Sequence, residues 1–351
     1  MSNSFKVSYL TTLPKVANAP RVTIKGDDIQ TYRVEFNKKL DNGVLIPIAE
    51  GYCKTNDTIV SNVRQWYTDW FIRIFDENDK IVFEDKFDPY NRVVFIKIDA
   101  YALGDTIAWI PYVEDFRCKY QCTVICSTFH NHLLVDSYPN ILFVIPNTYI
   151  ANVYAQYYIG AANDDSLIYS PIKTNEHPLQ RVASECLGLT PMEFRPDLSE
   201  LCKYEPRRIV RKYVTLSEFG SHPEKHWRAE NGWQTVVDFL IENDYEVLTI
   251  SKEKSSLKGV IDMSGEADLK KVAGLIKHAE FHMGVSSGLS WLAWGVGTHV
   301  VMISDSTPKF HEFESDITRI SANDLQSIDY GDVEITEIDE VLSKIKLLLR
   351  C

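Results

Sequence analysis

Residues 283–308 read MGVSSGLSWLAWGVGTHVVMISDSTP: a buried strand, a glycine-serine turn, a short apolar helix and a second strand at 299–303. This order predicts one unit of an α/β fold with a parallel sheet. Ser286, Ser287 and Gly288 form the turn, so free backbone N–H groups and the positive end of the helix dipole would meet there. A phosphate group fits such a turn.

Length, charge and composition limit the number of domains and the kinds of partner. The chain has 351 residues, too many for one hydrophobic core, so we expect two or three domains. The formal net charge of −12 disfavours nucleic acid and anionic membranes as partners. The N-terminus lacks a signal-peptide pattern, the apolar runs are too short to span a bilayer, and the seven cysteines lack disulfide spacing. These features predict a cytoplasmic protein with no membrane span.

The pattern of short segments predicts three parts. Residues 1–90 hold short strands and a hairpin of 70–75 with 81–87, which indicates a small sandwich or barrel. Its aromatic residues then form a core, or alternatively a glycan-stacking surface. From residue 92 strands alternate with helices, and a proline-rich linker at 190–208 separates two α/β units. We expect strands at 93–98, 122–127, 141–145, 213–217 and 246–250, and helices at 105–120, 177–187, 231–243, 268–278 and 337–349.

Open α/β sheets bind ligands in the turns after their strands, and two further turns stand out. In residues 99–105, Gly104 allows close backbone approach, and Asp105 is either a functional carboxylate or a helix cap. In residues 217–227, glycine, serine and Lys225 supply what a diphosphate needs, although the segment also fits a solvated loop. It lacks the spacing of a Walker motif.

Several blocks together resemble a known family. ALGDTIAWIP, the turn with Gly220, Lys225 and Trp227, and GVSSGLSWLAWGVGTHVV are similar to signature blocks of glycosyltransferase family 9, the heptosyltransferases. The likeness runs from about residue 66 to 308 and is strongest to the autotransporter branch, which adds heptose to Ser or Thr hydroxyls of bacterial surface autotransporters. It implies an α/β fold of GT-B type: a β-rich domain (1–90), a Rossmann-like domain with the catalytic base (91–205) and a Rossmann-like nucleotide-sugar domain (206–351).

The resemblance also implies roles for individual residues. Asp105 matches the catalytic base, and Lys225 matches the lysine that contacts the donor diphosphate. In general family 9 enzymes an Asp and a His stand at the positions of Ser286 and Trp291. His130 and His132 lie in a strand-to-helix turn, where they contact acceptor or donor or else serve the turn itself. The full donor-binding set is Ser217, Gly220, Ser221, Lys225, Trp227, Ser286, Ser287, Gly288, Leu289 and Thr307.

Cofactors and partners follow from the same comparison. The autotransporter branch carries an iron-binding cysteine cluster near its end, but here no cysteine lies between Cys202 and Cys351. With no D-x-D pair either, we expect no bound iron and no cofactor beyond the nucleotide-sugar, ADP-heptose. The expected partners are this donor and an autotransporter-like acceptor protein; the missing cluster argues against a ring-like assembly and leaves a homo-oligomer open. Two alternatives remain: an enzyme of the same fold acting on a glycan such as lipopolysaccharide core, and a non-catalytic nucleotide-sugar-binding protein.

Overall fold

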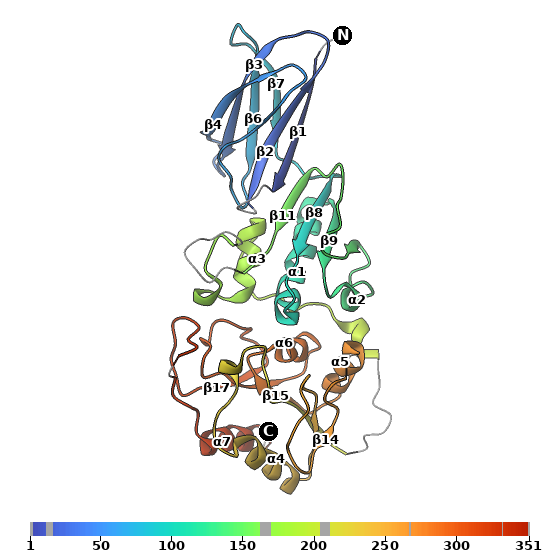
Figure 1. Ribbon diagram of the computed structural model, residues 1–351, viewed down its shortest axis with the longest axis vertical. Coiled ribbons are helices and arrows are strands. Elements are labelled where there is room, and N and C mark those ends of the chain that lie inside the picture. The colour runs from blue at the N-terminus through green and yellow to red at the C-terminus, as the bar shows by residue number, and fades with distance from the viewer. Residues whose placement is uncertain are drawn as a thin grey trace.

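The computed structural model describes residues 3–11, 17–161, 170–203, 211–266, 268–331 and 333–349. It is a mixed α/β protein, as predicted, with a β-rich end followed by two α/β lobes along the long axis (Figure 1). The seven helices of the described chain are α1 (Leu103–Tyr120), α2 (Asn131–Leu134), α3 (Leu179–Leu187), α4 (Gly232–Glu242), α5 (Leu269–Lys277), α6 (Gly288–Gly295) and α7 (Ile338–Leu348). Short 3₁₀ turns are η1 (Thr174–Glu176), η2 (Ser199–Lys203) and η3 (Pro223–Lys225).

The first α/β lobe and the N-terminal strands share one sheet. Its order is β10 (Ile141–Val144), β9 (Thr123–Thr128), β8 (Val93–Ile98), β11 (Ala155–Tyr158), β1 (Ser4–Thr11), β2 (Asn18–Lys25) and β5 (Thr58–Val60). The first four strands are parallel, and β1 joins them in parallel to β11 with Tyr9 opposite Ala155. The sheet therefore crosses the predicted boundary between residues 90 and 91.

A second, antiparallel sheet completes the β-rich end, in the order β4 (Leu45–Lys54), β3 (Thr31–Lys39), β6 (Trp70–Phe75) and β7 (Ile81–Lys86). The predicted hairpin is the β6–β7 pair. Tyr9 of β1 donates a hydrogen bond to Asp85 of β7 at 3.0 Å, and Phe5 packs on Phe83. Trp70 is buried, so this aromatic belongs to the core and not to a glycan-stacking surface.

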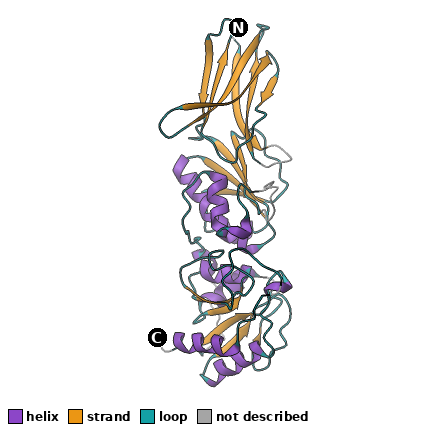
Figure 2. Ribbon diagram, turned by 90° about the vertical axis from the view of Figure 1, so that its left-hand side faces the viewer, coloured by secondary structure: helices purple, strands orange, loops and turns teal. Residues whose placement is uncertain are grey.

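The C-terminal lobe is a fully parallel sheet. Its order is β14 (Ile261–Asp262), β13 (Glu246–Thr249), β12 (Tyr213–Ser217), β15 (His282–Val285), β16 (Val300–Ile303) and β17 (Ile317–Ile320). Strands β12 and β15 are buried along their whole length, as expected for strands covered on both faces. Helices pack on the parallel sheets of both lobes (Figure 2).

The linker after α3 ties the lobes together. Tyr112 of α1 donates a hydrogen bond to the carbonyl of Met192, and Arg195 forms an ion pair with Asp316 at 2.5 Å. The Glu193 carboxylate accepts hydrogen bonds from the backbone and the hydroxyl of Ser315. These bonds fix the angle at which the two lobes meet. Residues 204–210, the end of the predicted linker, lie outside the described residues.

Gly188 shows why glycine ends α3. It is the predicted C-cap, with a left-handed φ of +62°, and a Cβ there would lie 2.1 Å from Tyr67 Cδ1. Gly43 has a similar φ of +82° but open space around it.

We expect Gly43→Ala to lower the free energy of unfolding by about 1–2 kcal/mol, because alanine in a left-handed conformation is strained. Gly188→Ala should cost a further ~1–3 kcal/mol, because its methyl group must also displace the Tyr67 ring. Chemical denaturation of both variants measures the difference. Equal losses would show that Tyr67 does not restrict this position.

Candidate active site

Three turns of the C-terminal lobe meet at one edge of its sheet. They follow β12, β15 and β16, which are parallel neighbours, so their carboxyl ends lie side by side. The turn after β8 of the first lobe faces them, because α1 begins where α6 begins (Figure 1). The three turns predicted from sequence, which follow β8, β12 and β15, therefore lie in one region of the structure.

The starts of α1 and α6 touch through two glycines. A Cβ on Gly288 would lie 2.9 Å from Leu103 Cβ and 3.2 Å from the Gly104 nitrogen. A Cβ on Gly104 would lie 3.0 Å from Trp291 Cδ1. The close approach predicted for Gly104 is thus real, but its partner is the other lobe. Two helix N-termini, each with free N–H groups and a positive dipole end, converge here.

Asp105 lies in the first turn of α1, at this junction. Ala102 is the N-cap and no side chain caps the helix, so the cap alternative for Asp105 is wrong. Burial raises the pKa of Asp105 to about 6, although the charge of Lys225 lowers it in part. Near neutral pH the group is therefore ionised yet basic enough to accept a proton, as a general base requires.

Lys225 lies at the end of η3, close enough for its charge to lower the pKa of Asp105 in part. Its Nζ lies 3.5 Å from Ser286 Oγ, and in the described part of the chain it has no ion-pair partner within 4 Å. Gly220 lets this turn pack closely, because a Cβ there would lie 3.4 Å from both Lys225 Cβ and the Ser286 carbonyl oxygen. The lysine is therefore a positive charge without a carboxylate bonded to it, next to the start of α6.

Beneath the turn lies a buried ion pair. Ser286 donates its hydroxyl hydrogen to Glu312, and Glu312 pairs with Arg319. Burial alone would raise the pKa of Glu312, but Arg319, His311 and the hydrogen bonds outweigh burial and hold this pKa below its usual range. Glu312 is hence an ionised carboxylate beneath the site, and Arg319 balances its charge.

Three buried oxygens at this sheet edge have no hydrogen-bond partner in the described chain: Ser287 Oγ, Thr307 Oγ1 and Glu218 Oε2. They follow β15, β16 and β12, respectively. A buried polar atom without a partner costs about 1–3 kcal/mol, so a polar ligand bound at this sheet edge would relieve that cost. Ser287 and Thr307 were predicted; Glu218 and Glu312 were missed, since a carboxylate is not an expected neighbour of a diphosphate.

Other predicted residues have different surroundings. The Ser217 hydroxyl lies 3.2 Å from His282 Nε2, and burial lowers the pKa of this histidine to about 3, so its ring is neutral. Ser221 is exposed, and Leu289 packs on the core. The Trp227 indole donates to the Thr336 carbonyl at 2.8 Å. These contacts hold Ser217, Leu289 and Trp227 in place, and their contact with the donor stays a prediction.

The two predicted histidines lie after β9 in the first lobe. His130 begins α2, and its Nε2 is 3.0 Å from the carbonyl oxygen of Tyr101, in the turn before Asp105. Burial lowers the pKa of His130, whereas His132 is exposed. His130 thus fixes the turn that carries the proposed base, and its contact with a substrate stays a prediction.

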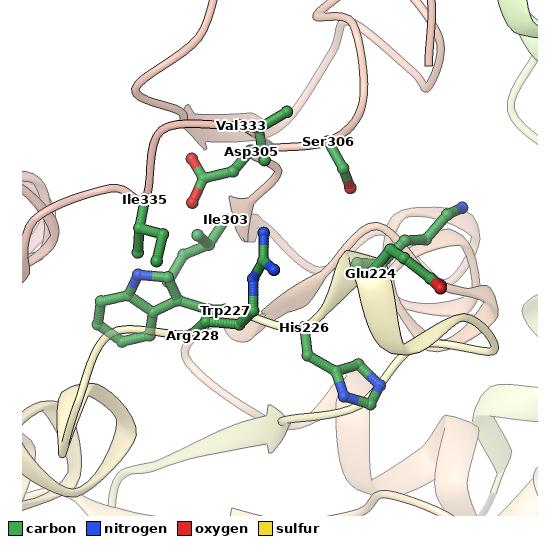
Figure 3. Close-up of a pocket in the computed structure, with 10 residues that line it drawn as sticks. Glu224, His226, Trp227, Arg228, Ile303, Asp305, Ser306, Val333 and Ile335 are labelled. Atoms are coloured by element: carbon green, nitrogen blue, oxygen red, sulfur yellow. The ribbon is translucent and has the colours of Figure 1, made fainter. Parts of the chain in front are cut away.

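A small pocket opens beside Lys225 (Figure 3). Trp227, Ile303, Val333 and Ile335 form its apolar wall. The Asp305 carboxylate on its rim is held by the backbone N–H groups of Ala322 at 3.1 Å and Thr336 at 2.9 Å. The rest of the lining is polar or charged and consists of Glu224, Lys225, His226, Arg228, Asp305 and Ser306.

The described residues contain no group of three or more His, Cys, Asp or Glu side chains that could hold a metal ion. Cys202 and Cys351 are not among the residues whose side chains are described. No helix in the described ranges is long and apolar enough to cross a bilayer.

Comparison with known proteins identifies the class as nucleotide-sugar-dependent glycosyltransferases. The profile of glycosyltransferase family 9 (heptosyltransferase) matches residues 191–312. Autotransporter heptosyltransferase Aah of Escherichia coli is 32% identical over 274 residues, which cover 74% of this chain and 69% of that protein. The inactive autotransporter heptosyltransferase BimC of Burkholderia thailandensis is 29% identical, covering 73% and 63%. The chain belongs to the autotransporter heptosyltransferases of family 9.

A solved structure shows the same fold. TibC, described as a dodecameric iron-containing heptosyltransferase in complex with ADP-D-beta-D-heptose, matches with a TM-score of 0.80 at 22% identity. The match covers 99% of this chain and 96% of that one.

The expectation of no cofactor and no iron is wrong. TibC, whose whole length this chain follows, is described as iron-containing in two structures.

The raised pKa of Asp105 predicts a pH-dependent cost to stability. Between the unfolded pKa near 3.8 and the folded value of about 6, the folded chain holds the proton more tightly, so its stability falls as the pH rises. Asp105→Asn removes this cost and should stabilise the protein at pH 8 by about 2–3 kcal/mol. Denaturation at pH 8 and pH 4 measures it, with the gain expected to vanish at pH 4. A variant no more stable than wild type at pH 8 would contradict the burial of an ionised carboxylate.

Proposed function

We propose that the protein is an inverting glycosyltransferase that moves a heptose from ADP-heptose to Ser or Thr hydroxyls of an autotransporter-like surface protein. The observation that carries the proposal is that the buried Asp105 lies where the starts of α1 and α6 touch, within reach of the charge of Lys225. Membership in the autotransporter heptosyltransferases and the ADP-heptose complex of TibC support the choice of donor.

The chemistry needs one base and one anion site. Asp105 takes the proton of the acceptor hydroxyl as its oxygen bonds to the anomeric carbon of the heptose. The bond from that carbon to the diphosphate breaks, and ADP leaves with the electron pair. Lys225 and the N–H groups at the start of α6 stabilise the charge that develops on the diphosphate. A single displacement of this kind inverts the anomeric carbon.

We further assign the enzyme to the GT-B type. In this assignment residues 1–90 form a β-rich domain, 91–205 a Rossmann-like domain with the base, and 206–351 a Rossmann-like donor domain. The donor would lie at the edge formed by the turns after β12, β15 and β16. Ser287 and Thr307 would contact its phosphates.

The two alternatives make different predictions. An enzyme for a glycan acceptor would transfer heptose to lipopolysaccharide core and leave proteins unmodified. A non-catalytic binding protein would bind ADP-heptose without turnover; one relative, BimC, is described as inactive. Mass spectrometry of both acceptors after incubation with ADP-heptose separates all three functions.

Transfer should depend on an ionised Asp105. Below pH 6 we expect kcat/KM to fall about tenfold per pH unit, because only the deprotonated carboxylate accepts the hydroxyl proton. Asp105→Asn should abolish transfer but retain ADP binding, measured by calorimetry. A flat profile between pH 5 and 8, or turnover by the variant, would refute Asp105 as the base.

Lys225→Met should weaken ADP binding about 10- to 100-fold, because a charge-assisted hydrogen bond to phosphate is lost. Lys212→Met is the matched control: Lys212 precedes β12 and so lies at the opposite edge of the sheet, yet its loss changes the net charge equally. Calorimetry should show unchanged ADP affinity for Lys212→Met. Equal weakening in both variants would mean that overall charge, not a contact by Lys225, governs binding.

A further inference from the structure

We propose that Glu312 is a positioning residue that holds Lys225 in place through Ser286, and that the neighbouring Ser287 is the serine whose hydroxyl contacts the donor diphosphate. The inference rests on the proposed function, because it assumes that Lys225 and the start of α6 face the donor. It gives the two serines of the turn different roles.

The first step is a count of hydrogens. A serine hydroxyl has one hydrogen to donate, and Ser286 donates it to Glu312. The Ser286 oxygen then offers only lone pairs, and Lys225 Nζ lies 3.5 Å from it as a donor. Ser286 therefore has no hydrogen left for a phosphate oxygen, but it is a fixed acceptor for the lysine.

The second step is the rigidity of Glu312. Its side chain is 0% exposed, and Arg319 pairs with its second oxygen. Arg319 is itself anchored, since it donates to Ser304 Oγ at 2.7 Å and to the Pro308 carbonyl at 3.1 Å. A buried carboxylate fixed in this way can orient the Ser286 hydroxyl in one direction only.

Ser287 differs from Ser286 in every one of these respects. Its Oγ is buried without a hydrogen-bond partner in the described chain, and it does not cap α6 although Ser287 is the N-cap residue. Thr307 Oγ1, on the next turn, is also without a partner. Both hydroxyls keep their hydrogens available for an anionic ligand.

The charged groups around Lys225 come from four elements. Asp105 faces it from α1; His311 lies next to it, and burial, the largest influence, lowers the pKa of that histidine. Glu312, on the same loop as His311, and Arg319 of β17 neutralise each other. Tyr330 near Glu312 has a raised pKa, mainly through burial, and stays uncharged. Lys225 is therefore the cation that acts on Asp105, and displacing it should raise the pKa of Asp105.

Two alanine variants of adjacent serines test the proposal. Asp105 is observed by carbon NMR of aspartate-labelled protein, with Asp105→Asn assigning its signal, and ADP binding is measured by calorimetry. Ser286→Ala should raise the pKa of Asp105 by about one pH unit, because Lys225 loses its anchor. The ADP affinity of Ser286→Ala should fall less than that of Ser287→Ala, because bound phosphate itself attracts Lys225. Ser287→Ala should weaken ADP binding about tenfold and leave the pKa of Asp105 unchanged.

Glu312→Gln should reproduce the effect of Ser286→Ala on Asp105; if thermal unfolding shows that this variant does not fold, the serine pair carries the test. Equal loss of ADP affinity in both serine variants with an unmoved Asp105 titration would overturn the proposal. A wild-type chain that does not bind ADP would instead refute the proposed function, and the two failures are thereby distinguishable.

Discussion

The contact between the starts of α1 and α6 is the constraint on which the site depends. Two helices from different lobes can meet end to end at this distance only where side chains are absent, and Gly104 and Gly288 meet that requirement. Because the helices meet there, a carboxylate from one lobe and a lysine from the other lie in the same small region. The linker bonds of Glu193 and Arg195 hold the lobes at the angle that this contact needs.

Charge balance explains why such a site is stable. The Glu312–Arg319 pair is buried but neutral, so it costs less than either charge alone would. Asp105 and Lys225 are not neutralised to the same degree, since the pKa of Asp105 stays raised even with the lysine nearby. The protein thus gives up stability where its chemistry needs a basic carboxylate, and the three unpartnered oxygens described at this sheet edge add to that cost.

Much of this architecture could be predicted from the sequence. The apolar run of β8 and the glycine after α3 correctly predicted a strand and a helix end, because burial on both faces and a left-handed cap leave clear patterns. The joining of β1, β2 and β5 to the first lobe could not be predicted, because pairing between distant strands has no local signal. The same holds for Glu312: its importance comes from Ser286, 26 positions earlier, and no spacing rule links the two. The expectation of no iron was wrong because the absence of one cysteine pattern was taken as absence of the metal.

A crystal structure of the chain with ADP-heptose tests the central claim most directly. The account predicts a diphosphate at the start of α6, within hydrogen-bond distance of Lys225 and Ser287, and an anomeric carbon that faces the Asp105 carboxylate. A diphosphate bound away from α6, or an anomeric carbon facing a different base, would contradict it.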